Sequence, residues 1–289
     1  MKAAPFAICT PDSITEAVAC LTEYGDDARV LAGGQSLLPL MAMRRRSPAV
    51  LVDLRRLHDL DHVTPADAHV AIGAMTRQRT VERSADVGAS VRCLALAVPQ
   101  IAHVTVRNQG TIGGSIAHAD PSAELPTVAL ATDATMVVRG PGGERAIAAA
   151  EYFLGPHRNA MAADELLTDI RFPLDPPGSG CAFEEVSRRP GDVAIVGVAA
   201  MVQLDSDGRI AQARIAMSSV APTPIRAVGA EAMLAGHSPV ADLYAAAAAA
   251  AAAITEPFSD LNGSGAYRRH LAAVLVRRTL AIAAERAAR

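Results

Sequence analysis

Hydrophobic and polar positions alternate with two different patterns in the first 175 residues. Short apolar runs bounded by turn residues predict strands, whereas apolar residues three and four apart predict helices. Residues 13–25 form the clearest helix, because Ser13 is a good N-cap, Glu16 is its capping-box partner and Gly25 ends the pattern. The strands predicted here are 6–9, 28–32, 49–54, 69–74, 135–140, 145–148 and 165–173, and the further helices are 36–45, 90–99 and 122–131.

The pattern changes at residues 173–180, where three prolines and two glycines cannot continue a helix or a central strand. Three consecutive strands and then three helices follow. The strands are 181–189, 194–205 and 209–220, and the helices are 224–235, 240–254 and 266–288. The last helix places Leu271 and Leu275 on one side and arginines on the other, which predicts a helix lying on a sheet. We therefore predict two α+β domains, residues 1–175 and 176–289, the second with a three-stranded antiparallel sheet.

Composition excludes some classes of function. A net charge of −3 and a pI near 6.2 give no reason to expect nucleic acid or an acidic membrane surface as a partner. The aromatic content is only 3%, which argues against a base-stacking platform. The four cysteines show no C-x-x-C spacing, so we expect buried hydrophobic roles for them and no metal-ligating residue in this chain.

Targeting signals and membrane spans are not expected either. The N-terminal residues lack the apolar core of a signal peptide. The alanine run 245–253 is too short and too weakly apolar for a membrane span, and it predicts a packed helix instead. We expect a cytoplasmic protein.

Two glycine pairs are the candidate binding features. Gly33 and Gly34 stand between a predicted strand and a helix, with neither dinucleotide-fingerprint nor P-loop spacing. Gly113 and Gly114 stand in "VRNQGTIGGSIAHADPSAELP", residues 106–126. Glycine permits positive φ and close approach of a ligand, and successive N–H groups can bind an anion. The residues alone leave two alternatives. Each glycine pair forms a plain turn, or the two segments together hold a pyrophosphate ligand from both sides.

These segments resemble a known family. "LAGGQSLLPLMAMR" and "TIGGSIAHADPSAELP" are similar to the FAD-binding medium subunit of the molybdenum hydroxylases, the xanthine dehydrogenase and aerobic carbon monoxide dehydrogenase family. The likeness is greatest to the carbon monoxide dehydrogenase medium subunit. "RRPGDVAIVGVAAMVQLD", "APTPIRAVGAEAML" and "YRRHLAAVLVRRTL" resemble the C-terminal domain of the same flavoproteins, so the resemblance covers nearly the whole chain.

The resemblance implies a fold and a cofactor site. The fold would be an FAD-binding domain of the vanillyl-alcohol-oxidase (PCMH) type, followed by a small C-terminal α+β domain. Both glycine segments would clamp an extended FAD, the Glu124 carboxylate would accept from a ribityl or ribose hydroxyl, and Leu167 would contact the flavin. The implied cofactor-binding residues are Ala32, Gly33, Gly34, Gln35, Ser36, Thr111, Ile112, Gly113, Gly114, Ser115, Glu124 and Leu167.

The resemblance also implies an oxidoreductase subunit without catalytic acid–base residues. Electrons would pass from two [2Fe–2S] clusters on a small subunit to this FAD, and then to a quinone, NAD⁺ or O₂. A large subunit would carry the molybdenum cofactor, and the whole would form a dimer of heterotrimers that can reach the inner face of the membrane. Two alternatives remain: a free-standing FAD-dependent oxidase or reductase of the same fold superfamily, and a scaffold that has lost FAD.

This sequence departs from the family at several positions. Gln35 replaces a histidine common in carbon monoxide dehydrogenases, and Val193 replaces an often aromatic residue that can cover the flavin. We expect structural roles for His118 and Asp120, because electron transfer needs no proton-transfer pair. We also expect Gly33→Val to abolish FAD retention without disturbing the fold.

Overall fold

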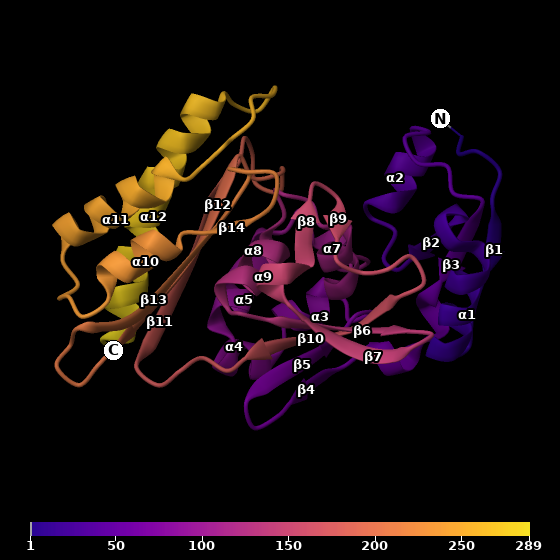
Figure 1. Cartoon of the computed structure of the whole chain (residues 1–289), viewed down its shortest axis with the longest axis horizontal. Helices are drawn as coiled ribbons and strands as arrows, with labels where there is room; N and C mark the ends of the chain where they lie inside the picture. Colours follow the sequence, from indigo (N-terminus) through magenta and orange to yellow (C-terminus); the bar gives the residue numbers. More distant parts are fainter. Residues whose placement is uncertain (1) are drawn as a thin grey trace.

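The computed structural model describes residues 2–289, in which two α+β halves pack side by side (Figure 1). The first half contains a three-stranded parallel sheet, a five-stranded antiparallel sheet and a two-stranded hairpin. The second half contains a four-stranded antiparallel sheet. This is the α+β class that the sequence predicts.

The parallel sheet forms from the beginning of the chain. Its strands, in the order β1-β3-β2, are β1 (Ala7–Cys9), β2 (Ala28–Leu31) and β3 (Val50–Asp53). Helix α1 (Ile14–Tyr24) connects β1 to β2 and buries an apolar side against the sheet. As predicted, Ser13 caps α1, since its Oγ accepts from the Glu16 N–H at 3.2 Å, and Gly25 ends it.

The five-stranded sheet is the centre of the first half. Its strands, in the order β4-β5-β10-β6-β7, are β4 (Val63–Pro65), β5 (His69–Gly73), β10 (Leu166–Pro173), β6 (Thr135–Gly140) and β7 (Gly143–Ala148). Strand β10 pairs antiparallel with β5 on one side and β6 on the other, although β5 lies far from it in the sequence. Strands β8 (Phe153–Gly155) and β9 (Arg158–Asn159) form the separate hairpin.

Short helices connect the strands of the first half. They are α2 (Leu37–Ala42), α3 (Gln78–Glu82), α4 (Ala85–Ser90), α5 (Arg92–Ala97), α6 (Val104–Arg107), α7 (Ile112–His118), α8 (Glu124–Ala131) and α9 (Ala149–Tyr152). The 3-10 turns are η1 (Gly25–Asp27), η2 (Leu54–Arg56), η3 (His58–Leu60) and η4 (Val98–Gln100). The predicted helix 90–99 is shorter than expected, because Pro99 lies in η4. Every residue of α8 is buried, since this helix lies between the halves.

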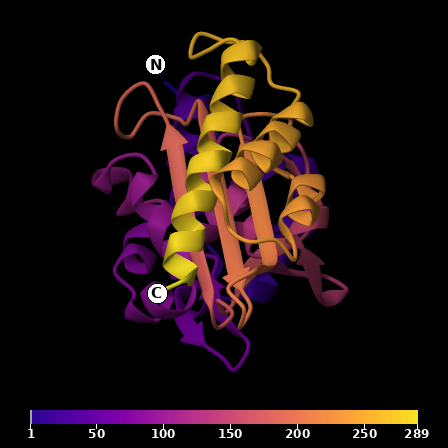
Figure 2. The same ribbon diagram turned by 90° about the vertical axis from the view of Figure 1, so that its left-hand side faces the viewer.

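The second half is a sheet covered on both faces. Its strands, in spatial order, are β11 (Ser179–Val186), β12 (Val196–Leu204), β13 (Ile210–Ser218) and β14 (Ile225–Arg226). The helices α10 (Val228–Leu234), α11 (Ala241–Ala253) and α12 (Gly265–Ala287) cover the outer face, along which α12 runs (Figure 2). The two-residue β14 extends the predicted three-stranded sheet.

The continuous apolar run of β12 follows from this layering. Val198 and Ala200 belong to the core under α10–α12, whereas Ala199 and Met201 belong to the core of the first half. A strand buried on both faces needs apolar residues at odd and even positions. No helix among residues 2–289 combines the length and hydropathy that crossing a membrane requires.

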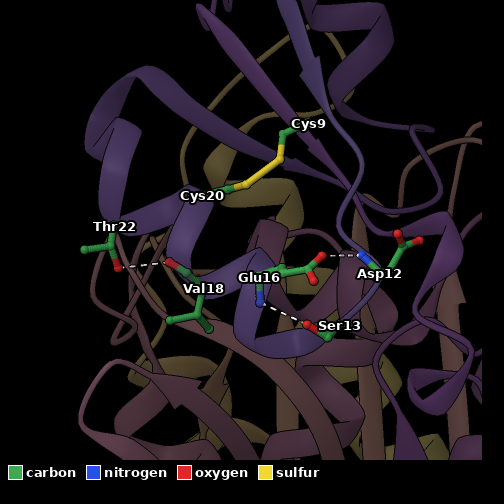
Figure 3. Close-up of a disulfide and its surroundings, with 7 residues drawn as sticks. All are labelled: Cys9, Asp12, Ser13, Glu16, Val18, Cys20 and Thr22. Carbon is green, nitrogen blue, oxygen red and sulfur yellow. Dashed lines mark hydrogen bonds between the residues drawn. A yellow bond between two sulfur atoms is a disulfide. The ribbon is translucent and has the colours of Figure 1, made fainter.

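The cysteines correct one expectation. Cys9 of β1 and Cys20 of α1 are joined in a disulfide rather than being separate buried hydrophobes (Figure 3). The fold brings them together because α1 packs back on the sheet that contains β1. Cys93 of α5 and Cys181 of β11 are buried free thiols. Hydrogen bonding to Cys181 and burial raise the pKa of Cys93. Both cysteines belong to one hydrophobic core, to which α5 of the first half and β11 of the second half contribute.

Candidate functional site

The first glycine segment, residues 32–36, connects β2 to α2 and presents free backbone donors. Gly34 has φ +71°, a conformation that favours glycine. The N–H groups of Gly34, Gln35 and Ser36 donate no hydrogen bond within residues 2–289. The Gln35 side chain folds back, since its Nε2 donates to the Gly33 carbonyl at 3.1 Å. Consecutive free N–H groups in such a turn are suited to binding an anion.

The second glycine segment differs from the open loop that the sequence suggests. Thr111 is the N-cap of α7, and its Oγ1 accepts from the Gly114 N–H at 3.0 Å. The other N–H groups of this turn are also bonded within the chain: Ile112 to the Thr76 carbonyl, Gly113 to that of Ala74 and Ser115 to that of Thr111. The start of α7 therefore offers a close-packed surface, whereas the first segment offers the free donors.

The two glycine segments, eighty residues apart in the sequence, touch each other. A Cβ added at Gly33 would overlap the Gln109 carbonyl oxygen and lie 2.8 Å from the Gly110 Cα. A Cβ added at Gly114 would lie 3.6 Å from the Ala32 Cβ. The missing side chains thus allow the turn after β2 to lie directly against the segment that leads into α7.

Two acidic residues meet where the halves join. Glu124, the first residue of α8, is 8% exposed, and burial raises its pKa to about 7. Burial and the neighbouring Glu124 charge raise the pKa of Glu185, on β11, to about 8. The Oε2 of Glu185 has no hydrogen-bond partner within residues 2–289. Near neutral pH these carboxyl groups therefore keep protons that exposed carboxyl groups release.

Sequence reasoning named Glu124 but missed Glu185. Alternate residues of β11 face opposite sides, and Cys181 and Phe183 belong to the core of the first half. Glu184 faces the helices, because it pairs with Arg278 of α12 at 2.9 Å. The alternation in "CAFEEV" was therefore a usable signal that Glu185 faces the first half.

Replacing Glu124 by glutamine tests the burial of this carboxyl group. The pKa of Glu124 in the folded state, about 7, lies above its ordinary value of 4.5 in an unfolded chain. The bound proton therefore stabilises the folded state fully below pH 4.5, and this stabilisation disappears as the pH rises to 7. We expect Glu124→Gln to gain about 3 kcal/mol over the parent between pH 4.5 and pH 8. Urea unfolding at both pH values measures this gain. Glu151→Gln, at an exposed position, is the control, and an equal pH dependence in all three proteins would contradict the assignment.

The remaining predicted positions lie in two places. Leu167 is buried in β10 and shares the core of the first half with Ile112 of α7. Val193 is 60% exposed in the connection between β11 and β12. The next carbonyl, that of Ala194, accepts from Ser219 Oγ at 2.9 Å, and the Ser219 N–H donates to the carbonyl of Pro121. This chain of bonds holds the Val193 segment beside the connection that leads to Glu124.

A histidine cluster lies at the other end of α7. His118 ends the helix, Asp120 follows, and His157 approaches from the hairpin of β8 and β9. Burial, followed by the positive charges of His157 and Arg46, lowers the pKa of His118, while Asp120 opposes this effect. Sequence reasoning did not name His157, because no local pattern links it to a residue 39 positions away.

The geometry fits the FAD that the family resemblance implies. The free N–H groups of Gly34, Gln35 and Ser36 suit a pyrophosphate, and the absent side chain of Gly33 brings a second backbone segment alongside. A largely buried carboxyl group at Glu124 suits a ligand hydroxyl. These three features lie in separate parts of the sequence.

Comparison with known proteins agrees with this geometry. Residues 4–175 match the FAD binding domain in molybdopterin dehydrogenase, and residues 181–283 match the CO dehydrogenase flavoprotein C-terminal domain. The chain is 40% identical over 287 residues to the 6-hydroxypseudooxynicotine dehydrogenase complex subunit alpha of Paenarthrobacter nicotinovorans, covering 99% of this chain and 97% of that protein.

Two further comparisons involve carbon monoxide dehydrogenase. The medium chain from Hydrogenophaga pseudoflava is 39% identical over 275 residues, covering 95% of this chain and 96% of the relative. A chain in the solved structure of carbon monoxide dehydrogenase from the same organism, lacking the Mo-pyranopterin moiety, is similar with a TM-score of 0.97 and 40% identity, covering 99% of both chains. The resemblance inferred from the sequence is thus confirmed: the chain belongs to the family of FAD-binding medium subunits of the molybdenum hydroxylases.

Proposed function

We propose that this chain binds one FAD between residues 32–36 and the first turn of α7, and that it is the electron-transfer subunit of a molybdenum hydroxylase complex. The observation that carries the proposal is the set of three free N–H groups where the two glycine segments touch. Membership of the medium-subunit family supports it. We also propose residues 1–175 as the FAD domain and 176–289 as the second domain.

The residues have different tasks in this proposal. Gly34, Gln35 and Ser36 donate to the pyrophosphate, and residues 111–115 form the wall against which the cofactor lies. Glu124 binds a ribityl or ribose hydroxyl, and a pKa of about 7 allows its carboxyl group to accept or donate. Leu167 contributes apolar surface. When bound, FAD supplies the electron carrier, and the protein supplies binding and orientation.

The complex follows from the family. We propose a large subunit with the molybdenum cofactor and a small subunit with two [2Fe–2S] clusters as partners, in a cytoplasmic dimer of heterotrimers. A quinone, NAD⁺ or O₂ would receive the electrons. The cysteines support a cluster-free chain, because two are joined to each other and two are buried where the halves meet. Gln35, in place of histidine, argues against assigning carbon monoxide as the substrate.

Gln35→Glu tests the FAD site without removing a packing group, because Gln35 is exposed. A carboxylate beside the free N–H groups would repel a pyrophosphate, and we expect FAD affinity to fall about tenfold, about 1.4 kcal/mol. The measurement is FAD binding by the chain co-expressed with its partner subunits. Gln212→Glu introduces the same charge at an exposed position of β13 and should leave FAD binding unchanged.

Three results would contradict the proposal. Equal FAD affinity of Gln35→Glu and Gln212→Glu would remove the first glycine segment from the site. An assembled complex without flavin would instead support the scaffold alternative. Turnover of an organic substrate by the chain alone would favour a free-standing oxidase, whereas the proposed subunit requires its partners for flavin reduction by substrate.

A further inference from the structure

Three side chains outside the proposed FAD contacts converge beyond the C-terminal end of α7. One potential ligand atom from each of His118, Asp120 and His157 lies within 4.8 Å of the other two. The two imidazole rings are 4.6 Å apart between centroids and tilted by 36°. Among residues 2–289, these three form the group of histidine, cysteine or carboxylate side chains that is close enough together to hold a metal ion.

Each of the three side chains keeps a free ligand atom. One Asp120 carboxylate oxygen accepts from the Ser122 N–H at 2.9 Å, which leaves the other oxygen available. His157 Nδ1 lies 3.3 Å from the His118 carbonyl, which leaves Nε2 available. The hydrogen bonds within residues 2–289 leave both ring nitrogens of His118 unused. The set therefore offers two nitrogens and one oxygen.

Backbone and side-chain bonds hold the two contributing segments together. The His157 N–H donates to the Ala119 carbonyl at 2.9 Å. The Asn159 side chain donates to the Ala117 carbonyl at 2.7 Å. The turn that carries His157 is thus attached to the end of α7 on both sides of the cluster. A ligand set held in this way loses little conformational freedom when it binds.

The donor set selects a class of metal ion. Imidazole nitrogens suit Zn²⁺, Co²⁺ and Ni²⁺, whereas Mg²⁺ and Ca²⁺ prefer sites built of oxygen. Two histidines and one carboxylate match a zinc site that keeps its fourth position for water. The nearby Arg46 charge disfavours an added cation, and the carboxylate of Asp120 opposes that charge. An ion here therefore depends on direct ligand bonds rather than on an acidic surface.

We propose that His118, Asp120 and His157 bind one divalent transition-metal ion, with Zn²⁺ as the representative occupant. Small side-chain rotations bring the three atoms to the bond lengths of about 2.0–2.2 Å that zinc requires. The ion would cross-link the turn between β8 and β9 to the end of α7. This proposal does not rest on the proposed function, because none of its ligands is assigned to FAD.

Metal binding by the tag-free full chain tests the site. Zn²⁺ affinity and stoichiometry are measured by competition with a chromophoric chelator, and Co²⁺ absorption reports the coordination. We expect one ion per chain, with affinity lowered about tenfold or more in His118→Gln and in His157→Gln. Asp120→Asn keeps the acceptor for Ser122 but removes the charge, and it should also weaken binding.

The matched control is His62→Gln. His62 forms a pair with Asp169 at 3.0 Å. It does not belong to the candidate metal-binding group found among residues 2–289. The His62→Gln variant should bind Zn²⁺ with the same affinity as the parent protein. Zn²⁺ should raise the melting temperature of the parent and of His62→Gln, but not of the double variant His118→Gln/His157→Gln. Equal Zn²⁺ affinity in the parent and the double variant, or no ion bound per chain, would overturn the proposal.

Discussion

Gly33→Ala is expected to weaken FAD binding by roughly a hundredfold and to lower the free energy of unfolding by about 3 kcal/mol. The new methyl group would overlap the Gln109 carbonyl oxygen and lie 2.8 Å from the Gly110 Cα, so backbone rather than a flexible side chain must move. Moving it separates the turn after β2 from the segment that leads into α7. FAD content of the assembled complex and urea unfolding of the chain measure the two effects.

Two glycine variants separate loss of the site from loss of the fold. Gly180→Ala creates a comparable overlap with backbone, here the Ala283 carbonyl oxygen of α12, in the second half and away from the proposed FAD contacts. It should cost similar stability while its folded fraction retains FAD. Gly88→Ala is the open control, because a Cβ there meets nothing within 4 Å and alanine favours the helix. If Gly180→Ala lost FAD to the same extent as Gly33→Ala, the contact of the two glycine segments would not be the binding feature.

The structure therefore revises the expected outcome of Gly33→Val. A larger side chain at this position does not leave the fold intact, because Gly33 is needed for contact between backbone segments. Gly113 has a similar packing task, since a Cβ there would lie 2.7 Å from the Ala74 Cα. A probe that spares the fold must use an exposed residue of the turn, which is the reason for choosing Gln35.

Arg268→Leu is expected to lower the free energy of unfolding by about 3–5 kcal/mol. Arg268 is 1% exposed, pairs with Asp260 at 2.7 Å and donates to the Ile195 carbonyl. Its guanidinium also lies 4.4 Å from the centre of the Phe258 ring. Leucine fills much of the volume, but it leaves the Ile195 carbonyl without this donor and removes the ion pair with Asp260, whose Oδ1 keeps only backbone N–H donors. Urea unfolding of the full chain measures the loss.

Arg277→Leu is the matched control for this experiment. Arg277 lies on the same helix, α12, but is exposed. Its replacement should change the free energy of unfolding by no more than about 0.5 kcal/mol. Equal stability of the two variants would show that the buried guanidinium does not hold α12 to the segments around Asp260 and Ile195.

The sequence predicted the elements with strong local signals. The α1 helix was found from its cap and stop residues, and the hairpin of β6 and β7 from its glycine turn. The continuous apolar run of β12 and the amphipathic pattern of α12 supported the prediction that strands precede helices in the second half. The start of α7 was missed, because two glycines have low helix propensity and only the Thr111 cap and the packing against Ala74 stabilise that turn.

Family likeness carried the candidate site beyond what local signals allow. Two glycine pairs are ambiguous alone, and the resemblance selected FAD as the ligand. Two further residues of these regions, Glu185 and His157, were not identified from the sequence. Glu185 and His157 act through neighbours on other elements, and their spacing from those neighbours follows no short-range rule.

The sequence by itself determined the α+β class, the order of the elements with strong local signals and membership of the medium-subunit family. These properties depend on local propensity, on apolar periodicity and on motifs within short segments. The tertiary structure alone decided that Gly33 lies against Gln109, that two carboxyl groups share the buried contact between the halves, and that His157 joins His118 and Asp120. The physical reason is that contact distance and burial arise from packing between segments far apart in the chain.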